Sequence, residues 1–170
     1  MTRLLGIDPG SRRLGWGIVD VEGSRLQHVA HGVVAARSDQ ELPDRLATIF
    51  AELEGIIARY RPDAAAIEEV FTARGPKAAL VLGQARGTAL VALRRGGLAI
   101  GEYAPAEVKL AVAGHGRATK EQLASMVGRL LGVDLADTPL DATDALAIAI
   151  CHAHGRARDR LVELARKGAR

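Results

Sequence analysis

Short apolar runs and apolar residues at helical spacing alternate along the 170 residues of the chain. Five runs are long enough for strands but too short for helices, at residues 3–7, 14–21, 29–36, 64–68 and 98–103. Elsewhere apolar residues recur every three or four positions, which predicts helices over 42–60, 76–93, 105–113 and 119–131 and from 138 onwards. The order β-β-β-α-β-α-β-α-α-α predicts an α/β fold, with a mixed five-stranded sheet and helices on both faces.

The connections between these elements indicate how the strands pair. Short links join the first three strands, which favours an antiparallel meander. The helix over 42–60 ends before Pro62 and crosses over to the fourth strand, so that strand is expected to lie parallel to the first. Thr119 and Gln122 have the spacing of a capping box, which places the start of a helix at this point.

Length and composition fit one domain with a real core, because 48% of the residues are hydrophobic. We expect this domain to cover residues 1–155 and a basic tail, either flexible or a frayed helix, to cover 156–170. Cys151 is the only cysteine, which excludes an intrachain disulfide and favours a reducing, cytoplasmic setting. No stretch is long and apolar enough to cross a bilayer, and no secretory signal is recognisable, so we expect no membrane partner.

Basic residues are concentrated in two regions, although the net charge is only +3. Residues 155–170 carry six Lys or Arg against two acids, and residues 71–129 carry nine against three. A basic region beside an acidic centre that holds metal ions suits a polyanion substrate such as nucleic acid. Surface charge of this size also serves solubility, so charge alone does not decide between these interpretations.

Four acids stand where separate elements begin or end. Asp8 closes the first strand just before a Pro-Gly turn, and Glu68 closes the fourth strand. Asp141 and Asp144 are three residues apart, so they share one face of the last helix. Each acid alone reads as an ordinary strand-end or capping residue. Together they predict a pocket for two divalent ions, and all-oxygen ligands favour Mg²⁺ or Mn²⁺ over zinc.

Four segments, in this order and spacing, resemble the bacterial RuvC family of Holliday junction resolvases: Gly6–Ser11, Ala66–Phe71, Leu82–Gly87 and Asp141–Ala149. The resemblance covers roughly residues 1–155 and implies an RNase H-like nuclease domain. It implies a Mg²⁺-dependent endonuclease that nicks two strands of a four-way DNA junction symmetrically and leaves 5′-phosphate and 3′-hydroxyl ends. It also implies a homodimer, with Gly83 and Gly87 near the subunit contact, that works with the RuvAB branch-migration machinery in recombination and repair.

The resemblance further implies roles for individual residues. The catalytic and metal-binding acids of the family fall on Asp8, Glu68, Asp141 and Asp144. Its DNA-contacting lysines fall on Lys109 and Lys120, and the aromatic that stacks at the junction centre falls on Phe71. We add Arg117, beside a Gly-His-Gly loop, as a further DNA-binding candidate. The plain alternatives are solvated lysines and a core phenylalanine.

Three other functions share some of these features. An actin-like kinase also opens with a strand, an Asp and a glycine-rich turn, but it needs two such domains and this chain has length for one. A non-catalytic junction-binding module would not need four acids, whose charge weakens DNA binding. Another RNase H-like nuclease, of the YqgF type or acting on RNA–DNA hybrids, fits less well with Phe71, Lys109 and Lys120.

Overall fold

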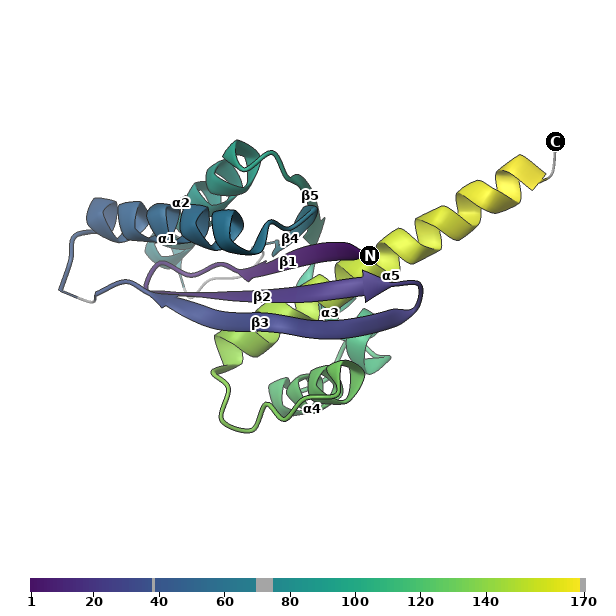
Figure 1. The fold of residues 1–170 in the computed structure, drawn as a ribbon. Coiled ribbons are helices and arrows are strands. Elements are labelled where there is room, and N and C mark those ends of the chain that lie inside the picture. Colours follow the sequence, from purple (N-terminus) through teal and green to yellow (C-terminus); the bar gives the residue numbers. More distant parts are fainter. Residues whose placement is uncertain (38, 70–74, 169–170) are drawn as a thin grey trace.

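The computed structural model describes residues 1–37, 39–69 and 75–168, and side chains as far as residue 159 (Figure 1). Within these residues one five-stranded sheet has the order β3-β2-β1-β4-β5. Its strands are β1 (Thr2–Asp8), β2 (Arg13–Glu22), β3 (Arg25–Ala35), β4 (Ala64–Glu68) and β5 (Ala99–Tyr103). The predicted order of elements is confirmed, although β3 begins four residues earlier than its apolar run suggested.

The strand pairing places β1 at the centre of a mixed sheet. β1 pairs antiparallel with β2, and β2 with β3, so the predicted meander is confirmed. β1 pairs parallel with β4, and β4 pairs parallel with β5. Because β1 and β4 run in the same direction, with Ile7 opposite Ile67, the acids that follow in each strand reach the same edge of the sheet.

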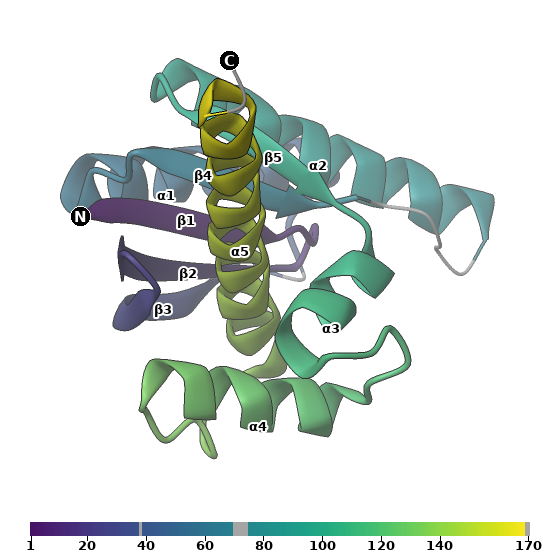
Figure 2. The same cartoon turned by 90° about the vertical axis from the view of Figure 1, so that its right-hand side faces the viewer.

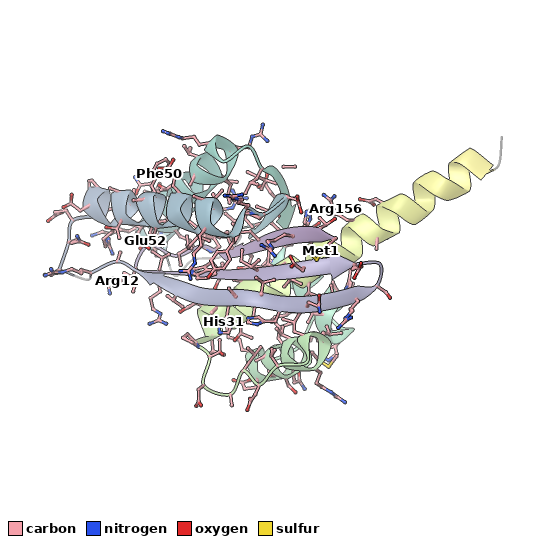
Figure 3. All side chains as sticks on the ribbon, in the orientation of Figure 1. Met1, Arg12, His31, Phe50, Glu52 and Arg156 are labelled. Atoms are coloured by element: carbon pink, nitrogen blue, oxygen red, sulfur yellow. The ribbon has the colours of Figure 1, made fainter. Side chains whose placement is uncertain are left out.

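Helices cover both faces of the sheet, as the sequence predicted (Figure 2). One face packs on α1 (Leu42–Tyr60) and α2 (Pro76–Arg95), and the other on α3 (Pro105–Ala113), α4 (Lys120–Leu131) and α5 (Leu140–Gly168). Figure 3 shows Phe50 on the α1–α2 side and His31 on the opposite side, where its ring lies 3.3 Å from the Thr138 hydroxyl. The architecture is the RNase H-like α/β fold expected from the sequence.

Strand parity decides which face each acid points toward. Ile7 and Ile67 belong to the core under α1 and α2, whereas Ala66 belongs to the core under α3, α4 and α5. Alternate side chains of a strand point to opposite faces. Asp8 and Glu68 therefore both face the α5 side, a choice that the sequence had left open for Glu68.

Helix α5 extends beyond the sheet that it packs on. It runs without a break from Leu140 to Gly168, so the backbone of the basic tail as far as residue 168 is helical. Figure 1 shows its last turns projecting beyond the sheet, and Figure 3 places Arg156 near Met1, at the opposite end of β1 from Asp8. Among the described residues, no helix combines the length and the apolar character needed to span a membrane.

Candidate active site

The four predicted acids lie on three elements that meet at one edge of the sheet. Asp8 and Glu68 end β1 and β4, and Asp141 and Asp144 lie near the start of α5. Figure 2 shows α5 crossing the face of the sheet, where it contacts β2, β1 and β4. The two aspartates of α5 therefore lie at the same edge of the sheet as Asp8 and Glu68.

Glycines in β1 and β2 let α5 approach closely enough for this. A Cβ atom on Gly6 would lie 2.0 Å from the backbone oxygen of Ala145, and one on Gly15 would lie 1.9 Å from that of Asp141. Since real Cβ atoms do not come so near, only glycine fits at these two positions. Gly15 is also the residue of β2 that pairs with Asp8. The helix backbone that carries Asp141 is thus pressed directly against the strand partner of Asp8.

The four carboxylates share one electrostatic neighbourhood. Burial raises the pKa of Asp8 to about 8, and the charges of Glu68, Asp144 and Asp141 add to the rise. Burial is also the largest cause that raises the pKa of Glu68, followed by the charge of Asp144. The ionised form of this cluster is unfavourable without a cation. The other three acids that the sequence singled out therefore lie close enough to Asp8 to raise its pKa.

Two basic side chains form ion pairs with the two aspartates of α5. Lys120 Nζ lies 2.7 Å from Asp144 Oδ2, and Arg13 Nε lies 2.6 Å from Asp141 Oδ2. The bond to Asp144 is the largest cause that raises the pKa of Lys120, and the charge of Asp8 contributes. In the part of the chain that the structure describes, no three Asp, Glu, His or Cys side chains are arranged to hold a metal ion. Asp141 and Asp144 point instead toward these basic groups.

The other predicted site residues differ in how close they lie to the four acids. Lys109, on α3, is near enough to lower the pKa of Glu68, although burial outweighs it. Lys120 is the first residue of α4, behind the Thr119 capping box predicted from the sequence. Arg117 is exposed in the loop between α3 and α4, with no hydrogen bond or ion pair to another described residue. Phe71 lies outside the described residues, so its predicted stacking role stays a prediction.

Two arginines at the site were not assigned from the sequence. Arg13 follows the Pro-Gly turn after Asp8 and reaches Asp141 across 128 residues of sequence. Arg86, on α2, donates from Nε to the backbone oxygen of Glu68 over 3.0 Å. Arg86 belongs to a segment that resembles the RuvC family, but nothing in its spacing indicates a contact with Glu68. Neither contact can be inferred from the spacing of residues along the sequence, because both depend on the tertiary fold.

Comparison with known proteins identifies the family. A family model described as crossover junction endodeoxyribonuclease RuvC matches residues 4–152. A curated relative of that name from Cereibacter sphaeroides is 52% identical over 153 residues, 89% of this chain and 89% of the relative. The chain belongs to the RuvC family. Another RuvC, from Geobacter sp., is 48% identical over 161 residues, which is 94% of this chain and 97% of that protein.

Two solved structures share the fold of this chain. A structure of Thermus thermophilus RuvC in complex with Holliday junction substrate superposes with a TM-score of 0.88 and 38% identity, and covers 94% of this chain and 97% of that one. Yeast mitochondrial Ydc2, another Holliday junction resolvase, matches at 14% identity with a TM-score of 0.65, which shows a shared fold. This RuvC family member is a crossover junction endodeoxyribonuclease, as its motifs implied.

Proposed function

We propose that Asp8, Glu68, Asp141 and Asp144 bind the divalent metal ions with which this RuvC family member cleaves junction DNA. The observation that carries the proposal is their convergence: three separate elements deliver four acids to one sheet edge, where burial and mutual repulsion raise the pKa of Asp8 to about 8. A fold has no structural need for such a cluster, which is unfavourable on its own. Binding of cations makes the arrangement favourable.

The donor set fits magnesium. All four side chains offer hard carboxylate oxygens, and no described Cys or His joins them. We therefore expect Mg²⁺, two ions in each active site, with Mn²⁺ able to replace it. When bound, such ions lower the pKa of a water nucleophile and neutralise charge on the phosphodiester. Arg13 and Lys120 each occupy one carboxylate oxygen, on Asp141 and Asp144, and would compete with metal ions for it.

Those basic groups are well placed to meet the DNA backbone once they are released. The side chains of Arg13 and Lys120 are more than half exposed, at 54% and 57%, and both reach the edge where the acids end. Lys109 lies close by on α3, next to Glu68. We propose that Lys109 and Lys120 bind phosphates of the cleaved strand and that Arg117 contacts the backbone further out. Phe71 would stack on an unpaired base, worth roughly 1–3 kcal/mol.

The substrate proposed is a four-way DNA junction, the ligand in the Thermus complex.

Symmetric cleavage of two strands requires two active sites, and we propose a homodimer in which the two subunits contact each other through α2. Leu80, Gly83, Gly87 and Val91 recur at helical spacing on that helix, and the side chains of Leu80 and Val91 are 70% and 55% exposed. An outward apolar stripe with glycines suits close packing of a second helix. We further propose RuvAB as the functional partner and the cytoplasm as the location.

Single conservative substitutions test the carboxylates. Asp8→Asn, Glu68→Gln, Asp141→Asn and Asp144→Asn each keep the side-chain shape and remove one charge, so each is expected to abolish cleavage while junction binding persists. Glu52→Gln on the exposed surface of α1 is the control and should cut normally. Cleavage of a synthetic four-way junction, and its binding in EDTA, are measured for all five variants. Near-normal cleavage by any of the four would remove that residue from the proposed site.

A further inference from the structure

Arg86 joins α2 to the strand ends that carry the active site. Its Nε donates to the backbone oxygen of Glu68 over 3.0 Å, and its Nη2 pairs with a carboxylate oxygen of Glu102 on β5. Only 18% of the Arg86 side chain is exposed. One guanidinium therefore bonds to both β4 and β5 from a third element.

The strand end that Arg86 holds is paired with a neighbouring strand on one side only. The recorded pairing of β4 with β1 stops at Ile67, one residue before Glu68. On the β5 side, Glu68 pairs with Tyr103, and the Glu69 amide donates to the Tyr103 oxygen over 2.8 Å. β4 itself ends at Glu68. The bond from Arg86 thus reaches the backbone of Glu68 where the ladder ends on one side.

The helix that carries Arg86 is itself firmly packed. Ala85 and Ala89, which flank it on the sheet-facing side, are fully buried, and Ala89 belongs to the core beneath α1 and α2. A partly buried arginine that already donates to two acceptors loses little further freedom when the site is used. Its planar fork fixes the direction of the Glu68 carbonyl as well as its distance from α2. This is more constraint than a surface ion pair provides.

We propose that Arg86 is a positioning residue for junction cleavage, which acts by fixing the backbone of Glu68 so that its carboxylate faces the other three acids. The proposal rests on the proposed role of Glu68 as a metal ligand. Groups that orient metal ligands typically contribute 10–100-fold in metal affinity or activity. Glu102 pairs with the other side of the same guanidinium, so it contributes indirectly by holding Arg86 in place.

The test compares metal dependence in variants that lose this contact. Arg86→Met removes both bonds, and Arg86→Lys keeps the charge but lacks the planar fork that directs one bond to each acceptor. We expect the Mn²⁺ concentration for half-maximal single-turnover cleavage to rise about tenfold or more in Arg86→Met. A smaller rise in the same direction is expected for Arg86→Lys and Glu102→Gln. The rise in melting temperature caused by Mn²⁺ without DNA should shrink in the same order, while junction affinity in EDTA stays within about twofold.

A matched control is available on the same helix. Arg94 Nη1 donates to the backbone oxygen of Leu98 over 2.9 Å, the same type of bond at the far end of α2. Arg94→Met should lower stability without changing the Mn²⁺ requirement. If Arg86→Met folds poorly, the comparison of Arg86→Lys and Glu102→Gln with Arg94→Met decides the question.

Two outcomes separate the positioning role from the site itself. If the Arg86 and Glu102 variants need no more Mn²⁺ than Arg94→Met, Arg86 is only structural, and the proposal is overturned while the site stands. If Glu68→Gln cleaves normally, the proposed site is wrong whatever the Arg86 variants do. If Arg86→Met loses junction affinity in EDTA and keeps its Mn²⁺ requirement, Arg86 acts on DNA binding, and the positioning role is rejected.

Discussion

Lys120 is a cation held inside an acidic centre by a contact that can open. Its amino group pairs with Asp144, and the charges of Asp8 and Asp141 also raise its pKa. Even so, 57% of the Lys120 side chain is exposed. The side chain of Asp144 is only 17% exposed, so its carboxylate needs another cation if the lysine leaves. With metal bound as proposed, the exposed ammonium can exchange this carboxylate for a phosphate.

Lys120→Ala is expected to weaken junction binding without unfolding the protein. Each lysine that neutralises a phosphate releases about one counterion, so the slope of log affinity against log salt should fall by about one. Fluorescence anisotropy with a labelled junction in EDTA, over a range of NaCl concentrations, measures that slope. Arg59→Ala on α1, an exposed cation on the opposite side of the sheet, should leave it unchanged. A slope that Lys120→Ala does not alter would argue against a phosphate contact.

The packing of α5 on the sheet is an element-scale requirement of the site. Because a Cβ on Gly15 would lie 1.9 Å from the Asp141 backbone oxygen, Gly15→Ala must push the helix away from β2. We expect a loss of roughly 3 kcal/mol or more in the free energy of unfolding, since overpacking against backbone cannot be relieved by a side chain. Cleavage should fall further than stability, because the shift moves Asp141. Urea denaturation and single-turnover cleavage measure the two effects.

Gly55 gives the matched comparison for this substitution. It lies in the interior of α1 with ordinary helical φ, and a Cβ there would meet nothing within 4 Å. Gly55→Ala should therefore stabilise the protein by about 0.5–1 kcal/mol through helix propensity, with cleavage unchanged. If Gly15→Ala proves as harmless as Gly55→Ala, close helix packing does not assemble the site.

The sequence predicted the elements better than it predicted their contacts. Apolar periodicity and Pro or Gly punctuation are local, so strand order, helix spans and the Thr119 capping box could all be inferred. The glycine contacts of β1 and β2 with α5, and the bond from Arg86 to Glu68, join residues far apart in sequence. No local pattern encodes such contacts. Strand ends and helical spacing singled out the four acids, and the resemblance implied a shared catalytic role for them, whereas the electrostatics that couple them came only from the fold.

Helix α2 carries a second element-scale prediction, on assembly. Its apolar stripe begins at Leu80, which is 70% exposed, and glycines at 83 and 87 leave room for a partner helix. Leu80→Glu would bury a charge in the proposed contact and should convert the proposed dimer to monomer at micromolar concentration, measured by sedimentation velocity. Leu110→Glu on α3 changes a residue of similar exposure, 58%, off this stripe and should leave the oligomeric state unchanged. A dimer that survives Leu80→Glu would place the subunit contact elsewhere.

At the scale of the whole molecule, the active site and the fold compete. Burial and three neighbouring carboxylates raise the pKa of Asp8 from 3.8 to about 8. Between pH 3.8 and about 8, Asp8 is therefore mostly protonated in the folded protein and mostly ionised in the unfolded chain. The stability that this group contributes is complete below pH 3.8, and it is lost as the pH rises through 8. Near neutral and alkaline pH, without metal, the protein is thus less stable than the same fold with a neutral residue at this position.

Asp8→Asn should accordingly be more stable than the wild type in EDTA at pH 8, although it cannot cleave. Asn keeps the shape of the side chain and cannot ionise, so the gain is on the order of a few kcal/mol at pH 8 and shrinks toward pH 4. Mg²⁺ should raise the melting temperature of the wild type, because it binds only the folded state, and should raise that of Asp8→Asn much less. Thermal unfolding at pH 4, 6 and 8, with EDTA or Mg²⁺, measures both effects, and Glu52→Gln serves as the neutral control. A less stable Asp8→Asn at pH 8 in EDTA would mean that the Asp8 carboxylate is stabilising as it stands, and that the acids meet for a reason other than cation binding.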